Sequence, residues 1–148
     1  MVDTLTPEQR SERMSRIRGR DTQPELALRR AIHAEGLRYR LHDADLPGKP
    51  DLVFPRFGAV VFVNGCFWHQ HAGCKVARVP ESNAGIWNAK FEANRCRDRR
   101  NVRQLRRLGW RVAIVWECQL STADRVAASV KRVRRFLRVD DAERMESR

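Results

Sequence analysis

A short segment, residues 66–74, concentrates side chains that can bind a metal ion. It contains Cys66, His69, His71 and Cys74, and a further cysteine, Cys118, lies far along the chain. Thiolate and imidazole groups are the ligands of closed tetrahedral zinc sites, and thiolates select zinc over magnesium or calcium. The pattern therefore predicts a structural zinc site, with His69 and His71 as alternatives for its nitrogen ligand.

The histidine that does not bind zinc is a candidate for acid–base chemistry. On an extended backbone, residues two positions apart point to opposite sides, so one histidine can face zinc while the other faces away. A neutral imidazole can accept a proton from an attacking water near pH 7. The segment can therefore carry both a metal ligand and a general base.

Asp51 is the candidate ligand for a second, catalytic metal. It precedes an apolar run at 52–54, a Pro-Arg-Phe-Gly turn at 55–58 and a second apolar run at 59–63. If the turn is centred near Phe57, antiparallel pairing places Asp51 opposite Val63. A carboxylate, a backbone carbonyl and waters form an ordinary magnesium site. Taken alone, Asp51 is more simply a residue that closes a Pro-Asp turn.

Glu25 has two interpretations. Thr22 precedes it by three positions, the spacing of a capping box in which the glutamate only stabilises the start of a helix. The same carboxylate can also support a catalytic metal, and at this point both interpretations stay open.

An alternation of helical and strand patterns must position these side chains. We expect a helix from 22–25 to Gly36, a short edge strand within 37–41, a hairpin over 51–63 and a buried strand over 111–116. A long helix over 84–108 should direct inward Ile86, Phe91, Val102 and Leu105. A last helix should run from 121–122 to Leu137. This order favours an α/β fold with a central mixed sheet flanked by helices.

The charge of the chain indicates its partner. Its 148 residues, enough for one domain, carry 30 Lys and Arg against 18 Asp and Glu, a net charge of +12. Such a field attracts nucleic acid.

No apolar run has the length of about 20 residues that crosses a bilayer, so we expect a cytoplasmic protein without membrane contact. We divide the chain into a basic arm (1–20), one domain (21–139) and a polar C-terminal tail (140–148).

Several segments together resemble the very short patch repair (Vsr) DNA mismatch endonucleases. They are Arg20–Thr22, Leu46–Asp51, Gly65–His69, Asn94–Arg100 and Leu108–Cys118. The resemblance extends from about residue 11 to residue 137. It implies a restriction-endonuclease-like fold and a monomer that nicks double-stranded DNA 5′ of the thymine in a T:G mismatch. Such mismatches arise by deamination of 5-methylcytosine, and the nick initiates very short patch repair.

The resemblance also implies roles for individual residues. Asp51 and the backbone carbonyl of Val63 would bind Mg²⁺, His69 would be the general base, and Glu25 would support the metal-bound waters. Structural Zn²⁺ would be held by Cys66, His71, Cys74 and Cys118. The aromatic side chains that wedge into the base stack would be Phe67, Trp68 and Trp87, although aromatic residues of this kind can also be core residues. The other DNA-binding candidates are Lys49, Asn64, Lys90, Asn94 and Arg97.

Asn64 is the main departure from the family pattern, since many members have a histidine there. Asparagine can hydrogen-bond a phosphate but cannot accept a proton at neutral pH. Two other functions therefore stay open. One is a zinc-stabilised protein that binds mismatched DNA without cutting it, and the other is a restriction-type nuclease that cuts both strands of paired DNA.

Overall fold

The centre of the molecule is a four-stranded mixed sheet in the order β1-β2-β3-β4. A computed structural model describes residues 21–147, and the predicted basic arm lies outside this range. Strands β1, β2 and β3 are antiparallel neighbours, whereas β3 and β4 run parallel. The bounds of the strands are Arg40–Leu41 (β1), Leu52–Phe54 (β2), Ala59–Asn64 (β3) and Arg111–Trp116 (β4). The α/β class and the mixed sheet are confirmed.

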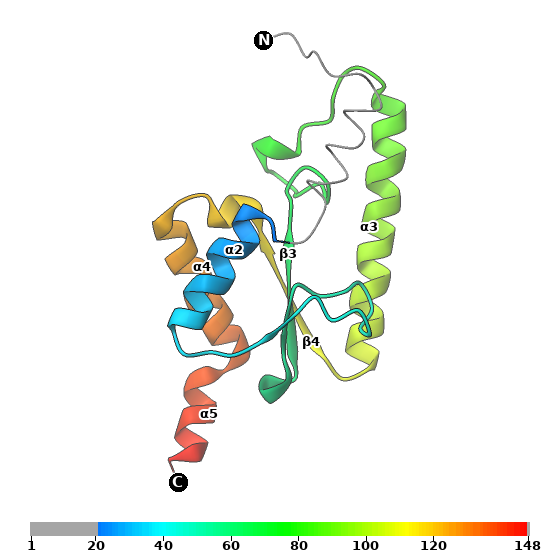
Figure 1. The fold of residues 1–148 in the computed structure, drawn as a ribbon. Helices are drawn as coiled ribbons and strands as arrows, with labels where there is room; N and C mark the ends of the chain where they lie inside the picture. The colour runs from blue at the N-terminus through cyan, green and yellow to red at the C-terminus, as the bar shows by residue number, and fades with distance from the viewer. Residues whose placement is uncertain (1–20, 148) are drawn as a thin grey trace.

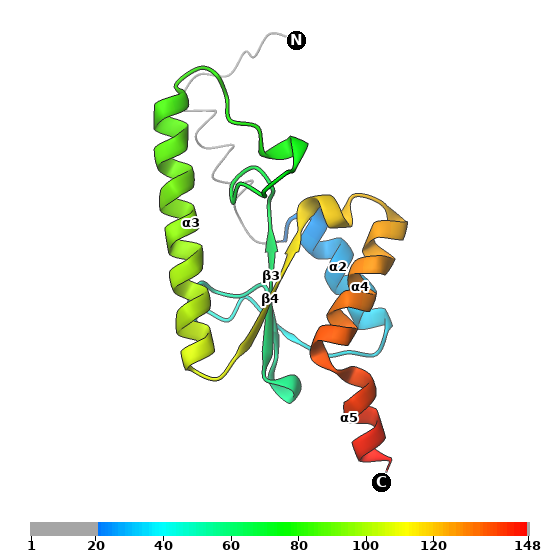
Figure 2. The same cartoon turned by 180° about the vertical axis from the view of Figure 1, so that it is seen from behind.

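Helices cover both faces of this sheet. Helix α2 (Gln23–Ala34) and helix α4 (Ala123–Leu137) lie on one side, and α3 (Ala84–Arg107) lies on the other (Figures 1 and 2). Alternate residues of the hairpin supply the two cores: Leu52 and Phe54 pack with α2 and α4, while Val53 packs with Leu105 of α3. Burial on both faces explains why the strands of the hairpin are unbroken apolar runs.

The hairpin forms where predicted, but its register differs by one residue. Phe54 pairs with Ala59 and Leu52 with Val61, so continuing the register places Asp51 opposite Phe62 rather than Val63. The cause is a four-residue turn, a 3-10 helix over Pro55–Phe57 followed by Gly58 at φ 58. Asp51 still reaches Val63, because its Oδ2 accepts a hydrogen bond from the Val63 backbone N–H at 2.7 Å.

Helix α3 and strand β4 are less buried than predicted. Phe91 and Leu105 are buried as expected, but Ile86 is 61% exposed. The first turns of α3 extend past the end of β3 (Figure 1), so Ile86 has no sheet to pack against. Strand β4 is the last strand of the described sheet, and within it only Val115 is fully buried. Its neighbour Ile114 is half-exposed and lines a cleft.

The C-terminal tail contains a helix that the sequence analysis did not predict. Helix α5 (Val139–Glu146) begins directly after α4, where Arg138 adopts φ 61 and breaks the helical path. Val139 anchors it, since this side chain is buried in the larger core.

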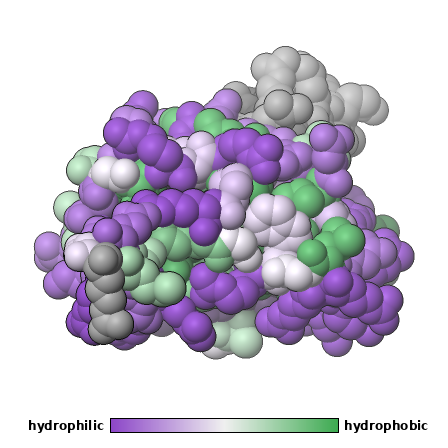
Figure 3. All heavy atoms as spheres, turned by 90° about the horizontal axis from the view of Figure 1, so that it is seen from below, coloured by the Kyte–Doolittle hydropathy of each residue, from purple (hydrophilic) through white to green (hydrophobic). Residues whose placement is uncertain are grey.

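Seen from below, hydrophilic side chains surround a smaller apolar area (Figure 3). Within residues 21–147, no helix combines the length and apolar character needed to cross a membrane.

Three shorter segments complete the described fold. Two are 3-10 helices at Lys75–Ala77 (η2) and Glu117–Leu120 (η3), and the third is the loop 42–50 that leads into β2. In that loop, Gly48 (φ 76) lies so close to Asn101 of α3 that an added Cβ would come within 2.9 Å of the amide nitrogen. This contact fixes the loop against α3 immediately before Asp51.

Candidate functional site

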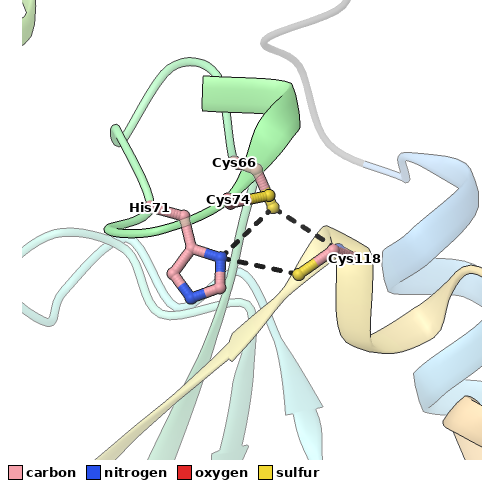
Figure 4. Close-up of side chains that lie close together, drawn as sticks. All are labelled: Cys66, His71, Cys74 and Cys118. Carbon is pink, nitrogen blue, oxygen red and sulfur yellow. Dashed lines mark hydrogen bonds between the residues drawn. The ribbon is translucent and has the colours of Figure 1, made fainter. Parts of the chain in front are cut away.

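Three cysteines and a histidine converge at one end of the sheet. The ligand atoms of Cys66, His71, Cys74 and Cys118 all lie within 4.8 Å of one another (Figure 4). The Nδ1 atom of His71 is 3.7 Å from Sγ of Cys66 and 3.5 Å from Sγ of Cys118. Tetrahedral zinc, with bonds of about 2.3 Å to sulfur and about 2.0 Å to nitrogen, places such atoms about 3.5 Å apart. This group can hold a metal ion, and its spacing fits zinc.

The topology explains how residues 52 positions apart meet at this centre. Cys66 follows β3 and Cys118 follows β4, and the parallel register pairs Asn64 with Trp116 at the ends of these strands. The Cys118 backbone N–H donates to Sγ of Cys66 at 3.4 Å. Burial raises the pKa of the Cys66 thiol to about 12, so its thiolate needs a bound cation to persist at neutral pH.

His71 and His69 diverge as predicted, but by a different backbone path. The His71 ring stacks on Trp116, with centroids 4.2 Å apart, and faces the cysteines. The segment between the histidines is a turn with Gln70 at φ 48, rather than the extended backbone that we assumed. The turn directs His69 to the other side, where its Nδ1 lies 2.6 Å from Oδ2 of Asp98.

A cleft of about 1000 Å³ lies beside this loop and brings together most of the predicted site residues. The predicted residues that line it are Glu25, Lys49, Asp51, Val63, Asn64, Phe67, Trp68, His69, Asn94 and Arg97. Trp87 and Lys90 do not line it. They lie on the early turns of α3, where the Lys90 ammonium is 5.3 Å from the centre of the Trp87 ring.

Two neighbouring carboxylates, those of Glu25 and Asp51, line the cleft. Burial raises the pKa of Asp51 to about 7, the Val63 N–H opposes this shift, and the neighbouring Glu25 carboxylate adds to it. Glu25 itself is only 2% exposed. The half-buried Asp51 carboxylate beside the buried Glu25 carboxylate is a fitting site for a divalent cation, which would favour the ionised form of Asp51.

Glu25 takes part in the start of α2, and its carboxylate also lines the cleft. Its backbone N–H donates to Oγ1 of Thr22 at 3.4 Å, which caps α2. Its carboxylate accepts instead from the Asp21 backbone N–H and from Arg29, both at 3.1 Å. The first half of a capping box thus forms, while the carboxylate faces the cleft.

Two residues of the cleft were missed by the sequence analysis. Asp98 is one of them, and its Oδ2 is hydrogen-bonded to Nδ1 of His69. It lies one helical turn after Asn94, whose amide donates to the Trp68 carbonyl at 3.1 Å. The four-residue spacing of these polar side chains within an arginine-rich helix was the available signal. His42 approaches both Glu25 and Asp51, and no local pattern indicated it.

The aromatic candidates form one cluster at the wall of the cleft. The Phe67 ring contacts Trp68, Trp87 and the buried Phe91 edge-on, with centroid distances of 5.0, 5.5 and 5.1 Å. Phe67 and Trp68 are half-buried and line the cleft, whereas Trp87 packs behind them. The cluster therefore packs against the buried Phe91, while Phe67 and Trp68 are accessible to a ligand in the cleft.

The raised pKa of Asp51 predicts that Asp51→Asn stabilises the metal-free fold. A folded-state pKa of about 7 exceeds the unfolded value, so the stabilisation by the bound proton is full below about pH 4 and is lost as the pH rises through about 7. Asparagine does not ionise, and we expect Asp51→Asn to be more stable than the wild type at pH 8 by on the order of 1 kcal/mol. Urea unfolding without divalent cations measures this difference, which should shrink between pH 7 and pH 4. The exposed Asp45 provides the control, since Asp45→Asn should show no such pH dependence. A destabilised Asp51→Asn at pH 8 would contradict the prediction.

Comparison with known proteins connects this geometry to an activity. The family model for the DNA mismatch endonuclease Vsr matches residues 2–75. The type II nicking enzyme V.XorIIP of Xanthomonas oryzae is 47% identical over 133 residues, which cover 90% of this chain and 97% of that protein. The DNA mismatch endonuclease Vsr of Escherichia coli is 43% identical over 120 residues, covering 81% and 76%. The type II nicking enzyme V.NmeAIP of Neisseria meningitidis is 39% identical over 120 residues, covering 81% and 85%.

Proposed function

This chain belongs to the Vsr family of DNA mismatch endonucleases, and from that premise we propose that it nicks one strand 5′ of the thymine in a T:G mismatch. The proposed reaction depends on magnesium, initiates very short patch repair and is carried out by a monomer with a restriction-endonuclease-like fold. The observation that carries the proposal is the cleft itself, in which the Asp51–Glu25 pair lies in one pocket with the His69–Asp98 pair.

The acidic pair is proposed to hold the catalytic metal. Asp51 and the backbone carbonyl of Val63 would bind Mg²⁺, and Glu25 would orient its waters. The metal would supply positive charge to offset the charge that builds up on the phosphate during hydrolysis. The fit of the half-buried Asp51 and the buried Glu25 carboxylates to a divalent cation supports this assignment.

His69 is proposed to take the proton of the attacking water. Its Nδ1 faces the Asp98 carboxylate at 2.6 Å, so the neutral ring carries its proton on Nδ1 and leaves Nε2 as the proton acceptor. The carboxylate also stabilises the imidazolium that forms when Nε2 accepts the proton. Asp98 is therefore a positioning residue for His69.

The zinc centre is proposed to hold this base in place. Cys66, His71, Cys74 and Cys118 are the proposed ligands of a structural Zn²⁺. They enclose the turn that carries His69, and Asn94 ties the same turn to α3 through the Trp68 carbonyl. A loop fixed at both ends keeps its side chains in one geometry, which general base catalysis requires.

The polar residues around the cleft are proposed to bind the DNA backbone. Lys49 and Arg97 are exposed where they line the cleft, so their cations can pair with phosphates. Asn64 is only 7% exposed at the end of β3, and its amide can hydrogen-bond a phosphate but cannot transfer a proton. Lys90 and Trp87 lie on the early turns of α3, outside the lining of the cleft, and would contact DNA beyond it.

Trp68→Ala is expected to lower the discrimination between mismatched and paired DNA. Stacking at a lesion depends on an aromatic face at the cleft, whereas phosphate contacts act on any duplex, so binding to T:G DNA should fall about tenfold or more while binding to paired DNA changes little. Titration of fluorescent duplexes with and without the mismatch measures the ratio. Trp87→Ala, outside the lining of the cleft, should have the smaller effect. Equal losses on both duplexes would assign Trp68 to the core.

The substrate assignment is tested by comparing nicking rates on labelled duplexes that differ at one base pair. With magnesium present, a T:G duplex should be cut much faster than the matching T:A and C:G duplexes, and flanking sequences should be varied around the mismatch. Binding of T:G DNA without cutting would favour the non-cleaving alternative. Cutting of both strands of the paired duplexes would favour a restriction-type nuclease.

A further inference from the structure

His42 occupies a constrained position beside the Glu25 and Asp51 carboxylates of the cleft. It is the first residue of the loop 42–50, adopts the left-handed conformation with φ 47, and its side chain is only 12% exposed. Its backbone N–H donates to the Asp51 backbone carbonyl at 3.3 Å. A non-glycine residue in this conformation is uncommon and is maintained by its surroundings, and here the surroundings are the proposed metal ligand.

The His42 ring lies between the two carboxylates. Its Nε2 is 3.3 Å from Oε2 of Glu25, and its Nδ1 is 3.8 Å from Oδ1 of Asp51. Glu25 belongs to α2 and Asp51 immediately precedes β2, so the ring is a spacer between two separate elements. Nε2 is buried, yet within residues 21–147 it makes no well-aligned hydrogen bond. Active-site hydrogen bonds are often misaligned in the free enzyme and align only in the complex.

The same neighbourhood does not form a metal site of its own. Asp21, Glu25 and His42 present ligand atoms within 4.8 Å of one another. However, the Arg29 guanidinium already lies 2.7 Å from Oδ1 of Asp21 and 3.1 Å from Oε2 of Glu25. A fixed cation at these two oxygens makes a second cation between Asp21 and Glu25 electrostatically unfavourable. The other neighbours of the Glu25 carboxylate are His42 and Asp51.

We infer that His42 is a positioning residue of the active site, which sets the separation and orientation of the Glu25 and Asp51 carboxylates so that Asp51 can bind one divalent cation while Glu25 orients the waters of that cation. The inference rests on the proposed function. It requires a side chain at position 42 that can donate a hydrogen bond, since the ring nitrogens face carboxylate oxygens and an ionised carboxylate only accepts. The inference therefore predicts different effects for a substitution that removes the hydrogen-bonding group and one that keeps such a group.

The test compares His42→Ala with His42→Gln, which restores a planar group that can hydrogen-bond. Mn²⁺ is titrated calorimetrically into the zinc-loaded protein without DNA, and nicking rates of a T:G duplex are measured over a range of Mg²⁺ concentrations. His42→Ala should weaken Mn²⁺ binding by about 10- to 100-fold, the effect of removing a group that orients a metal ligand. It should raise the Mg²⁺ concentration for half-maximal rate by a similar factor, with a smaller change at saturating Mg²⁺. His42→Gln should stay within about threefold of the wild type in both.

His33→Ala is the matched control, because His33 lies on the same side of the sheet near the end of α2 and contacts Tyr39 rather than the cleft. Wild-type Mn²⁺ affinity in His42→Ala would overturn the inference. So would an equal loss in the alanine and glutamine variants while melting temperatures stay at the wild-type value. A wild-type protein that binds Mn²⁺ but does not nick DNA would contradict the proposed function alone, and the Mn²⁺ titration would still decide the role of His42.

Discussion

Asp51→Asn is expected to abolish nicking of T:G DNA while the protein still folds and binds the mismatch. The substitution keeps the shape of the side chain but removes the charge that would hold the divalent cation, and metal catalysis accounts for several kcal/mol of the barrier, so the rate should fall by about 10³-fold or more. Single-turnover cutting at saturating enzyme measures this loss without interference from binding. Asp45→Asn, an exposed acid of the loop before β2, should cut at the wild-type rate.

His69→Ala belongs to the same experiment and tests the proton transfer. A general base contributes about 10²- to 10⁴-fold to a rate, and a loss of this size is expected with zinc content unchanged. Asp98→Asn should also slow cutting, because the Nδ1–H of His69 would lose its carboxylate partner at 2.6 Å. The assignment fails if His69→Ala cuts normally while His71→Ala loses activity and keeps its zinc, since ligand and base would then be exchanged.

Cys118→Ser is expected to lose the bound metal and most of the stability of the fold. The ligand set connects the ends of β3 and β4 through Cys66 and Cys118, and binding to a structural zinc site contributes directly to folding free energy. Loss of several kcal/mol is comparable with the total stability of a domain, about 5–15 kcal/mol. The variant should therefore be recovered largely unfolded or insoluble.

Elemental analysis and thermal melting measure this effect. The wild type should contain about one zinc per chain, because the four ligands fill one tetrahedral site, and a strong chelator should lower its melting temperature. Cys96→Ser is the matched control, since Cys96 is exposed on α3 and lies outside the ligand set. A metal-free preparation with normal melting would contradict the zinc assignment.

Local patterns predicted most of the elements and the cysteine–histidine cluster, but they left His69 and His71 open as its nitrogen ligand and did not predict α5. The strands of the hairpin are apolar on both faces and were predicted from that run, and the capped start and glycine stop of α2 follow known helix signals. The clustering of two cysteines and two histidines predicted the metal centre. Both classes of signal depend on residues close in the sequence, which is why a single sequence reveals them.

Features that depend on tertiary geometry were predicted incorrectly or missed. The register of the hairpin depends on the length of the turn at 55–58, and a four-residue turn shifted the partner of Asp51 by one position. Ile86 has the spacing of a core residue, but the sheet ends before it. His42 and Asp98 acquire their significance from partners contributed by other elements, and no local pattern records those partners.

We propose that the cleft containing Asp51 and His69 is a magnesium-dependent nicking site for T:G mismatches. The most direct test maps the products of one T:G duplex labelled on both strands, incubated with the zinc-loaded protein with and without Mg²⁺. We expect a single cut in the thymine strand, 5′ of the mismatched thymine, which requires Mg²⁺ and is absent with Asp51→Asn. Cutting in the guanine strand, or an equal rate without divalent cations, would contradict it.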